Sequence, residues 1–323
     1  MAAIIKTKLT NKLDIQHPVI QAPMAIAAGG ALAAAVSGAG GLGLIGGGYG
    51  DNEWLAEQFG LAGRQSVGCG LITWSLQEKP YLLQLVLEQD PAAVFLSFGD
   101  PAPFASDIRA ANVLLICQVQ TLRDAKHAMD VGADIIVAQG AEAGGHGEKR
   151  ATFTIVPEVA DYIARHSPDT LLCAAGGVAD GRGLAAALML GADGVVIGSR
   201  FWASEEALVH PNMLQAAVDA TGDETIRSSV MDIARKLAWP ERYTARVLKN
   251  AFTERWHNDI NGLISAAEEE AKKWSAAWVD GEVNTANTFV GEATGLIGSI
   301  KPAVEIFETI ISEAETRLRN NFV

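Results

Sequence analysis

Two glycine-bearing turns carry the clearest chemical signal in the sequence. Gly176 and Gly177 follow one short apolar run, and Gly198 and Ser199 follow the next. Glycine lets backbone N–H groups approach a phosphate closely, a helix that opens after such a turn adds a favourable dipole, and a serine hydroxyl adds a hydrogen bond. Paired glycines also occur in turns without a ligand. Two such turns at consecutive strand ends nevertheless indicate a phosphate-binding site.

A single histidine in a glycine-rich segment is the second candidate. Residues 139–147 read Gln-Gly-Ala-Glu-Ala-Gly-Gly-His-Gly. Gly144 and Gly145 permit a sharp turn that could aim His146 into a cavity, where an imidazole acts as a general base near neutral pH. Gln139 can donate to or accept from the edge of a planar ring ligand. The alternative is a surface histidine in a flexible glycine loop, and the chemistry of the residues leaves both interpretations open.

Two further motifs weigh less. Gln21-Ala22-Pro23-Met24 ends the first apolar run, and its small residues would let the backbone lie flat against a planar ring. Gly38-Ala-Gly-Gly-Leu-Gly43 matches the dinucleotide-binding pattern, but that fingerprint must follow a strand and open a helix. Here a helix is expected to end and a strand to begin. We therefore predict a turn and no dinucleotide site.

Eight continuous apolar runs must position these motifs. The runs lack polar alternation, as expected for parallel strands that are covered by helices. They span residues 18–23, 42–46, 66–72, 92–97, 113–119, 134–139, 170–175 and 194–198. Segments of helical periodicity separate them, at residues 31–37, 52–61, 80–89, 103–110, 122–131, 157–166 and 183–190.

A repeated junction favours a cyclic arrangement of these units. Residues 128–140 and 187–199 both contain a helix end, a Gly-Ala-Asp turn and a buried strand. The glycine supplies the left-handed helix terminus, and the aspartate can bond the turn backbone. The pattern predicts an α/β fold, a (β/α)8 TIM barrel, whose active site lies at the C-terminal ends of the strands. An open doubly wound sheet of eight strands is the alternative.

The sequence changes character after Phe201. Residues 206–285 are richer in charge and tryptophan, and they offer helical pattern but no good strand. We expect a barrel over residues 1–205, a helical cap over the barrel mouth at 206–285, and a C-terminal segment at 286–323. The amphipathic stretch 301–319 is predicted to return to the barrel as its last outer helix.

Composition limits the class of protein. The net charge of −13 argues against nucleic acid and anionic membranes as partners, so an anionic ligand must be held by local backbone donors. Cys69, Cys117 and Cys173 have no metal-type spacing and are expected to be reduced core thiols; no metal is predicted. Residues 15–50 lack charged residues, but prolines and glycines interrupt them, so strand, short helix and strand are expected. With no signal peptide recognised, a cytoplasmic enzyme is predicted.

The combined motifs resemble the nitronate monooxygenase (2-nitropropane dioxygenase) superfamily. The resemblance covers residues 10–203 and, more loosely, 294–313. It is carried by four segments: Pro18-Val-Ile-Gln-Ala-Pro-Met24, Ala138-Gln-Gly-Ala-Glu-Ala-Gly-Gly-His-Gly147, Ala174-Ala-Gly-Gly-Val-Ala-Asp-Gly-Arg-Gly183 and Val196-Ile-Gly-Ser-Arg-Phe201.

The resemblance implies an FMN enzyme that oxidises alkyl nitronates with O2 to a carbonyl compound and nitrite. His146 would be the base that deprotonates neutral nitroalkanes or steers the anionic nitronate. Its partners would be small molecules, the nitronate and O2, and the sequence does not indicate the oligomeric state. By motif, the residues that would bind FMN are Ala22, Met24, Gln139, Gly144, Gly176, Gly177, Val196, Ile197, Gly198 and Ser199.

Two details bear on the exact reaction. Relatives often carry Asn at the end of the third strand, where this chain has Gly70, so one flavin-contacting side chain is expected to be missing. The stretch Phe95-Leu-Ser-Phe-Gly-Asp-Pro101 resembles the monooxygenase branch more than the reductases. The same superfamily includes NAD(P)H-dependent quinone reductases and enoyl-acyl carrier protein reductases, and this activity is the alternative.

Overall fold

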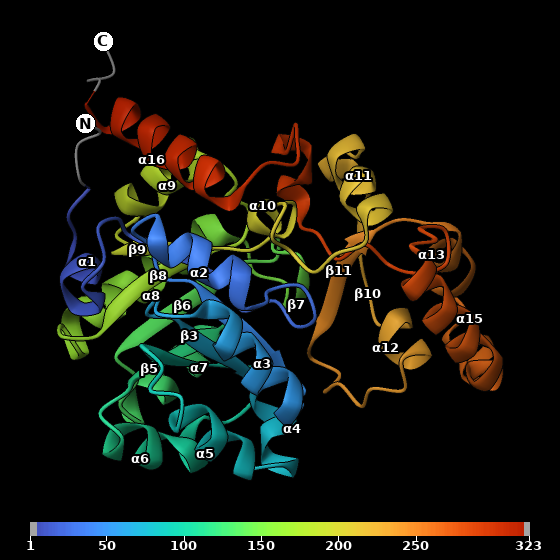
Figure 1. The fold of residues 1–323 in the computed structure, drawn as a ribbon, viewed down its shortest axis with the longest axis horizontal. Coiled ribbons are helices and arrows are strands. Elements are labelled where there is room, and N and C mark those ends of the chain that lie inside the picture. Colours follow the sequence, from blue (N-terminus) through green and yellow to red (C-terminus); the bar gives the residue numbers. More distant parts are fainter. Residues whose placement is uncertain (1–4, 320–323) are drawn as a thin grey trace.

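The computed structural model describes residues 5–319, which form a nearly closed barrel with a cap over one end (Figure 1). The eight predicted strands are all present and all parallel. In spatial order the barrel runs β1-β9-β8-β6-β5-β4-β3-β2. Its strands are β1 (Val19–Gln21), β2 (Leu44–Gly48), β3 (Gly68–Ile72), β4 (Ala93–Ser97), β5 (Leu114–Val119), β6 (Ile135–Gln139), β8 (Leu171–Ala175) and β9 (Gly194–Ile197).

The ends of the sheet meet at β1 and the residues before β2. Leu42 donates its N–H to Val19 O at 3.0 Å, and Gln21 donates to Leu42 O at 2.9 Å. A parallel bridge between Ile20 and Leu42 completes the contact. The open doubly wound alternative is therefore excluded, because such a sheet would leave both edges apart.

Burial on both faces explains why the strands lack polar alternation. On β6, Ile135 and Val137 belong to the cluster that fills the barrel, whereas Ile136 and Ala138 belong to the layer between the strands and the outer helices. All four side chains are completely buried. Cys69, Cys117 and Cys173 are free, buried thiols in the same two layers, as predicted.

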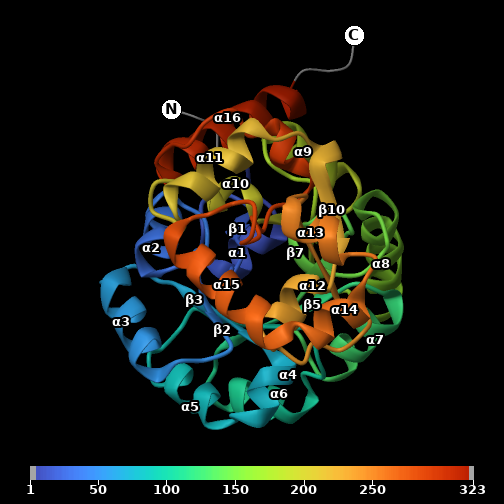
Figure 2. The same ribbon diagram turned by 90° about the vertical axis from the view of Figure 1, so that its right-hand side faces the viewer.

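Helices surround the strands, as the end-on view shows (Figure 2). The C-terminal helix α16 packs against α9 and α2 and closes the outer ring. The helices of the barrel are α1 (Lys8–Leu13), α2 (Gly30–Gly38), α3 (Asn52–Ala62), α4 (Thr73–Glu78), α5 (Tyr81–Leu87), α6 (Ala102–Ala110), α7 (Leu122–Asp130), α8 (Thr152–His166), α9 (Gly181–Met189), α10 (Ser199–Trp202) and α16 (Ala303–Arg319).

The repeated Gly-Ala-Asp turns have the same structure at both sites. Gly132 and Gly191 have φ values of 87° and 95°, the left-handed conformation that ends a helix. Asp134 and Asp193 do not bond their own turn. Each carboxylate accepts the N–H at the start of the neighbouring strand, at 3.0 Å. The repeat thus fixes strand register as well as helix termination.

The cap contains strands that the sequence analysis did not predict. β10 (Thr225–Ser228) and β11 (Thr244–Leu248) pair antiparallel, and β11 also pairs with β7 (Gly145–Gly147) from the barrel loop. The expectation of a strandless segment at 206–285 was therefore wrong. The cap's other elements are α11 (Pro211–Asp219), η1 (Gly222–Glu224), α12 (Val230–Ala234), α13 (Ala251–Trp256), α14 (Ile260–Ser265), α15 (Ala267–Asp280) and η2 (Glu292–Leu296).

Among residues 5–319, no helix combines the length and apolar content needed to cross a bilayer. The charge-free stretch 15–50 forms β1, α2 and β2, as expected.

Candidate active site

A cavity lies between the C-terminal ends of the barrel strands and the cap. It encloses about 1350 Å³ of empty space, part of it open to solvent. Ten of the eleven predicted site residues line it: Ala22, Met24, Gln139, Gly144, His146, Gly176, Gly177, Val196, Gly198 and Ser199.

Ile197 is the exception among the predicted residues. Its side chain is completely buried in the layer between the strands and the outer helices, because successive side chains of β9 point to opposite faces. Val196 points inward instead and reaches the cavity. Ile197 contributes to the site through its backbone, because its carbonyl oxygen accepts the N–H of the cavity-lining residue Ala22 at 2.9 Å.

The turns after β8 and β9 form a cradle of glycine. Gly176 and Gly177 have φ values of 98° and 76°. Among the described residues, the N–H groups of Gly177 and Val178 have no protein acceptor. A Cβ added at Gly198 would meet nothing closer than 3.6 Å, so the space beside it is open. Unused N–H donors on residues that line the cavity fit a phosphate group.

The helix that follows this turn, α9, begins at Gly181, two residues before the predicted start at 183. Asp180 caps α9, and its carboxylate accepts the N–H groups of Arg182 and Gly183 at 2.9 and 3.2 Å. The N-terminus of α9 is thus already occupied by the Asp180 carboxylate. The donors that remain for a phosphate are the backbone amides of the turn. The Ser199 hydroxyl accepts the N–H of Gly291 at 2.9 Å, which links the cradle to the segment after the cap.

His146 lies on β7 and not in a flexible loop. Its backbone pairs with Ala245 of β11, and Gly145 before it has a φ of 68°. Gln139 donates its side-chain N–H to His146 O at 3.1 Å, and its oxygen accepts from Gln118 and Gln120. The Gln139 amide therefore positions His146 and has little bonding capacity left for a flavin.

Three side chains hold the His146 imidazole. Its Nε2 lies 2.9 and 3.0 Å from the two carboxylate oxygens of Asp232. The ring stacks on Trp239, with ring centroids 3.3 Å apart and an interplanar angle of 4°. Phe98, whose φ of 63° is rare for an aromatic residue, contacts both rings edge-on. Backbone strain of this kind occurs mostly at functional sites.

Burial sets the protonation state of this histidine. Both side chains are nearly buried, with 8% of His146 and 4% of Asp232 exposed. Burial lowers the pKa of His146 below its ordinary value, and the hydrogen bond to Asp232 partly offsets that effect. The imidazole is thus neutral near pH 7 and able to accept a proton. Because Asp232 occupies Nε2, the atom available to a substrate is Nδ1.

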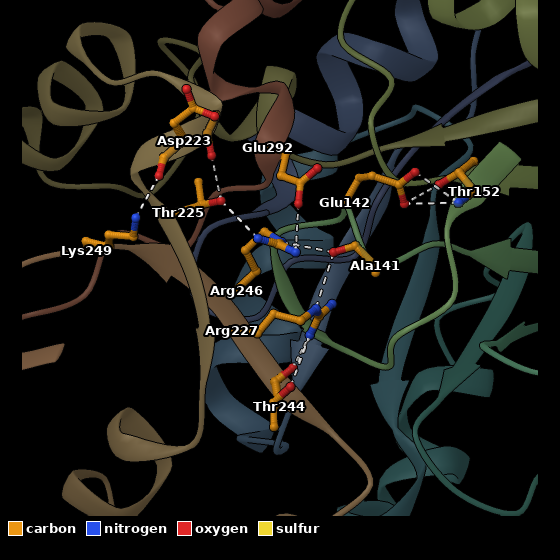
Figure 3. Close-up of polar contacts among 11 residues, drawn as sticks. Ala141, Glu142, Thr152, Asp223, Thr225, Arg227, Thr244, Arg246, Lys249 and Glu292 are labelled. Carbon is orange, nitrogen blue, oxygen red and sulfur yellow. Dashed lines mark hydrogen bonds and ion pairs between the residues drawn. The ribbon is translucent and has the colours of Figure 1, made fainter. Parts of the chain in front are cut away.

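Two arginines of the cap hold the segment that carries His146 (Figure 3). Arg227 on β10 and Arg246 on β11 both donate to Ala141 O, at 3.2 and 2.9 Å. Arg246 also forms an ion pair with Glu292 at 2.9 Å. On the barrel side, the Glu142 carboxylate accepts the N–H of Thr152 at 3.0 Å, so α8 begins there and not at Pro157 as predicted.

Gly70 proves to be tightly packed. A Cβ at this position would lie 2.2 Å from Pro23 Cβ, so an asparagine would not fit unless Pro23 moved. In this chain Pro23 occupies the space next to the strand-three end.

Asp232 and Trp239 are the site residues that sequence reasoning missed. Trp239 is one of several tryptophans in residues 206–285, and its spacing sets it apart from none of the others. Asp232 lies on α12, 86 positions after His146, and no local motif marks it. The one available signal was composition, since an aspartate between Met231 and Ile233 interrupts an apolar run.

Comparison with known proteins identifies a family and several relatives. A family model described as nitronate monooxygenase matches residues 6–61 and 75–313. A nitronate monooxygenase of Neurospora crassa is 34% identical over 93% of this chain and 90% of its own. A Rhodococcus jostii dehydrogenase of an octahydro-indene-carboxyl-CoA is 30% identical over 86% of this chain and 78% of its own. The structure of FabK from Thermotoga maritima superposes with a TM-score of 0.85, at 32% identity, over 97% of both chains.

Proposed function

The chain belongs to the nitronate monooxygenase family, and from that premise we propose that it oxidises alkyl nitronates with O2 to a carbonyl compound and nitrite, with FMN as its cofactor. One observation carries the proposal. His146, which is bonded to the buried Asp232, lines the same cavity as a cradle of unused backbone donors.

FMN fits the residues that line this cavity. The amides of Gly177 and Val178 would hold its phosphate, with Gly198 leaving space for it. Ala22 and Met24, at the end of β1, would face the ring system through their backbone. When bound, FMN would supply the redox chemistry, taking electrons from the substrate and passing them to O2.

The role of His146 is that of a general base. With Nε2 bonded to Asp232, Nδ1 takes the proton from the carbon next to the nitro group of a neutral nitroalkane. Asp232 then stabilises the imidazolium that forms, and stacking on Trp239 keeps the ring in one orientation. A nitronate that is already an anion needs no base, and His146 would then only position it.

An anaerobic reduction experiment tests the proposal. The purified holoenzyme is mixed without O2 with propionate-3-nitronate or with NADH, and the flavin absorbance is followed. We expect the nitronate to bleach the flavin rapidly and NADH to do so slowly or not at all. Rapid bleaching by NADH, with none by the nitronate, would contradict nitronate oxidation.

The alternative is an NAD(P)H-dependent reductase acting on quinones or enoyl thioesters. Similarity over nearly the full chain to FabK and to the carboxyl-CoA dehydrogenase supports it. The same experiment separates the two functions, because only a reductase needs the pyridine nucleotide.

A further inference from the structure

Arg235 is a positive charge in the cavity that the proposed reaction does not use. It follows directly after α12, the short helix that carries Asp232, and it is half-buried. Its guanidinium forms no ion pair with any carboxylate in the described part of the chain. Asp232, on the same helix, bonds His146 instead.

Aromatic rings surround this guanidinium. Its central carbon lies 5.5 Å from the centroid of Tyr49, 5.6 Å from Trp274 and 5.7 Å from Phe289. These distances are within the range of cation–π attraction. Trp274 is itself fixed, since its indole N–H donates to Asn287 at 2.9 Å. The guanidinium therefore sits in a preformed frame.

Two aromatic side chains connect Arg235 to His146 by a chain of contacts. The Trp239 ring stacks on His146 with one face, and its indole N–H donates to the Tyr49 hydroxyl at 3.0 Å. Tyr49 in turn lies against Arg235. All four residues line the same cavity. Because both residues line one cavity, a substrate whose reacting carbon lies at His146 can reach Arg235 with a more distant part of its chain.

Charge and geometry indicate which chemical group would bind at Arg235. A half-buried cation without a counter-ion is costly to maintain, and the aromatic rings offset only part of that cost. A planar guanidinium matches a carboxylate through two parallel hydrogen bonds. In a chain of net charge −13, an anion needs such a local partner to enter the cavity.

We propose that Arg235 and its aromatic frame form a carboxylate-binding subsite, which selects substrates with a carboxylate several atoms away from the reacting carbon. The substrate class rests on the proposed function, whereas the subsite itself does not. Arg235 is a specificity-determining residue in this scheme, and it takes no part in proton transfer.

Calorimetric titration of the holoenzyme tests the subsite without turnover. The ligands are hexanoate and hexanamide, which have the same size and differ in charge. For Arg235→Met we expect the Kd of hexanoate to rise about 10- to 100-fold, because a charge-assisted hydrogen bond is lost, and that of hexanamide to stay within twofold. Lys236→Met is the matched control, since it removes an exposed charge that pairs with Glu268 outside the cavity.

Kinetics then test the substrate class. The nitronates of 6-nitrohexanoate and 6-nitrohexanamide are compared, and Arg235→Met is expected to raise KM for the first alone, with kcat unchanged. In the binding experiment, an equal loss of affinity for hexanoate and hexanamide in Arg235→Met, or no loss for either, would show that Arg235 is purely structural. Either result would overturn the subsite. If hexanoate binding depends on Arg235 but neither nitronate is oxidised, the subsite stands and the proposed function fails.

Discussion

At the scale of single residues, the Asp232 carboxylate changes what His146 can do. Nε2 faces two oxygens at 2.9 and 3.0 Å, and one face of the ring is covered by Trp239. The imidazole is left with one tautomer and one free nitrogen. Orientation of this kind matters to catalysis because proton transfer requires the base within hydrogen-bond reach of the proton.

We expect activity on neutral nitroalkanes to fall in acid with a midpoint below pH 6.5. Burial depresses the pKa of His146, and the unprotonated form is the active one, so the rate is full above that pKa and is lost as the pH falls through it. Steady-state kcat/KM with 1-nitropropane, measured from pH 5 to 8, checks this. A profile with its midpoint above 7 would mean that another group is titrating.

Asp232→Asn is expected to lower that kcat/KM about 10²- to 10⁴-fold, since the imidazolium loses its stabilising carboxylate. The acid limb should move to lower pH, a shift that mere loss of structure would not cause. Preformed propyl-1-nitronate serves as the control, because it needs no deprotonation and should lose far less rate. An unshifted pH profile would remove Asp232 from the mechanism.

At the scale of elements, β7 joins the barrel to the cap. Its three residues come from the loop after β6, but their antiparallel partner is β11 in the cap. Arg227 and Arg246 on β10 and β11 reinforce the joint through Ala141 O. The Arg227 guanidinium is so far buried that its pKa drops to about 10. The loop that lines the cavity is thus held from both sides.

Loosening this joint should weaken cofactor binding. Arg246→Met removes the bonds to Ala141 and Glu292, and we expect the Kd of FMN to rise roughly tenfold as the loop gains freedom. Flavin fluorescence titration of the apoenzyme measures it. Lys249→Met is the control, because that side chain bonds only the backbone of Asp223, at the outer side of the same region. Equal FMN affinity in both variants would contradict the joint's role.

The same elements show what the sequence could and could not reveal. The eight barrel strands are predictable because burial on both faces leaves apolar runs between turns, as on β6. β7 is not, since Gly145, His146 and Gly147 have no intrinsic strand preference and pair only because β11 lies beside them. Asp232 escaped notice for a related reason. Its partner, His146, is remote in sequence, whereas the glycines of the cradle form motifs that can be recognised from neighbouring residues alone.

At the scale of the whole molecule, the ligands proposed for the cavity are anions, whereas the protein is strongly acidic. The net charge is −13, while the donors of the cradle are neutral backbone amides. The net charge therefore repels an anionic ligand at long range, whereas the backbone amides attract it at short range. Salt effectively screens only the long-range repulsion.

This balance predicts that FMN associates faster at higher ionic strength. Between about 10 mM and 500 mM NaCl, where the Debye length falls from about 30 Å to a few ångströms, we expect the association rate to rise several-fold. Stopped-flow quenching of flavin fluorescence on the apoenzyme measures the rate. A rate that falls with salt would point to steering by a cationic patch instead.

The antiparallel pairing of β7 with β11 has a consequence for how such enzymes diversify. The cradle at Gly176, Gly177 and Gly198 belongs to the barrel alone, whereas Asp232, Trp239 and Arg235 all arrive with the cap. A descendant could keep the barrel, and with it the cofactor, and inherit a different insertion that still supplies a strand to pair with β7. The histidine would stay in place with new neighbours. In this scheme the barrel would retain the proposed cofactor site, and the cap would supply the residues that face the substrate.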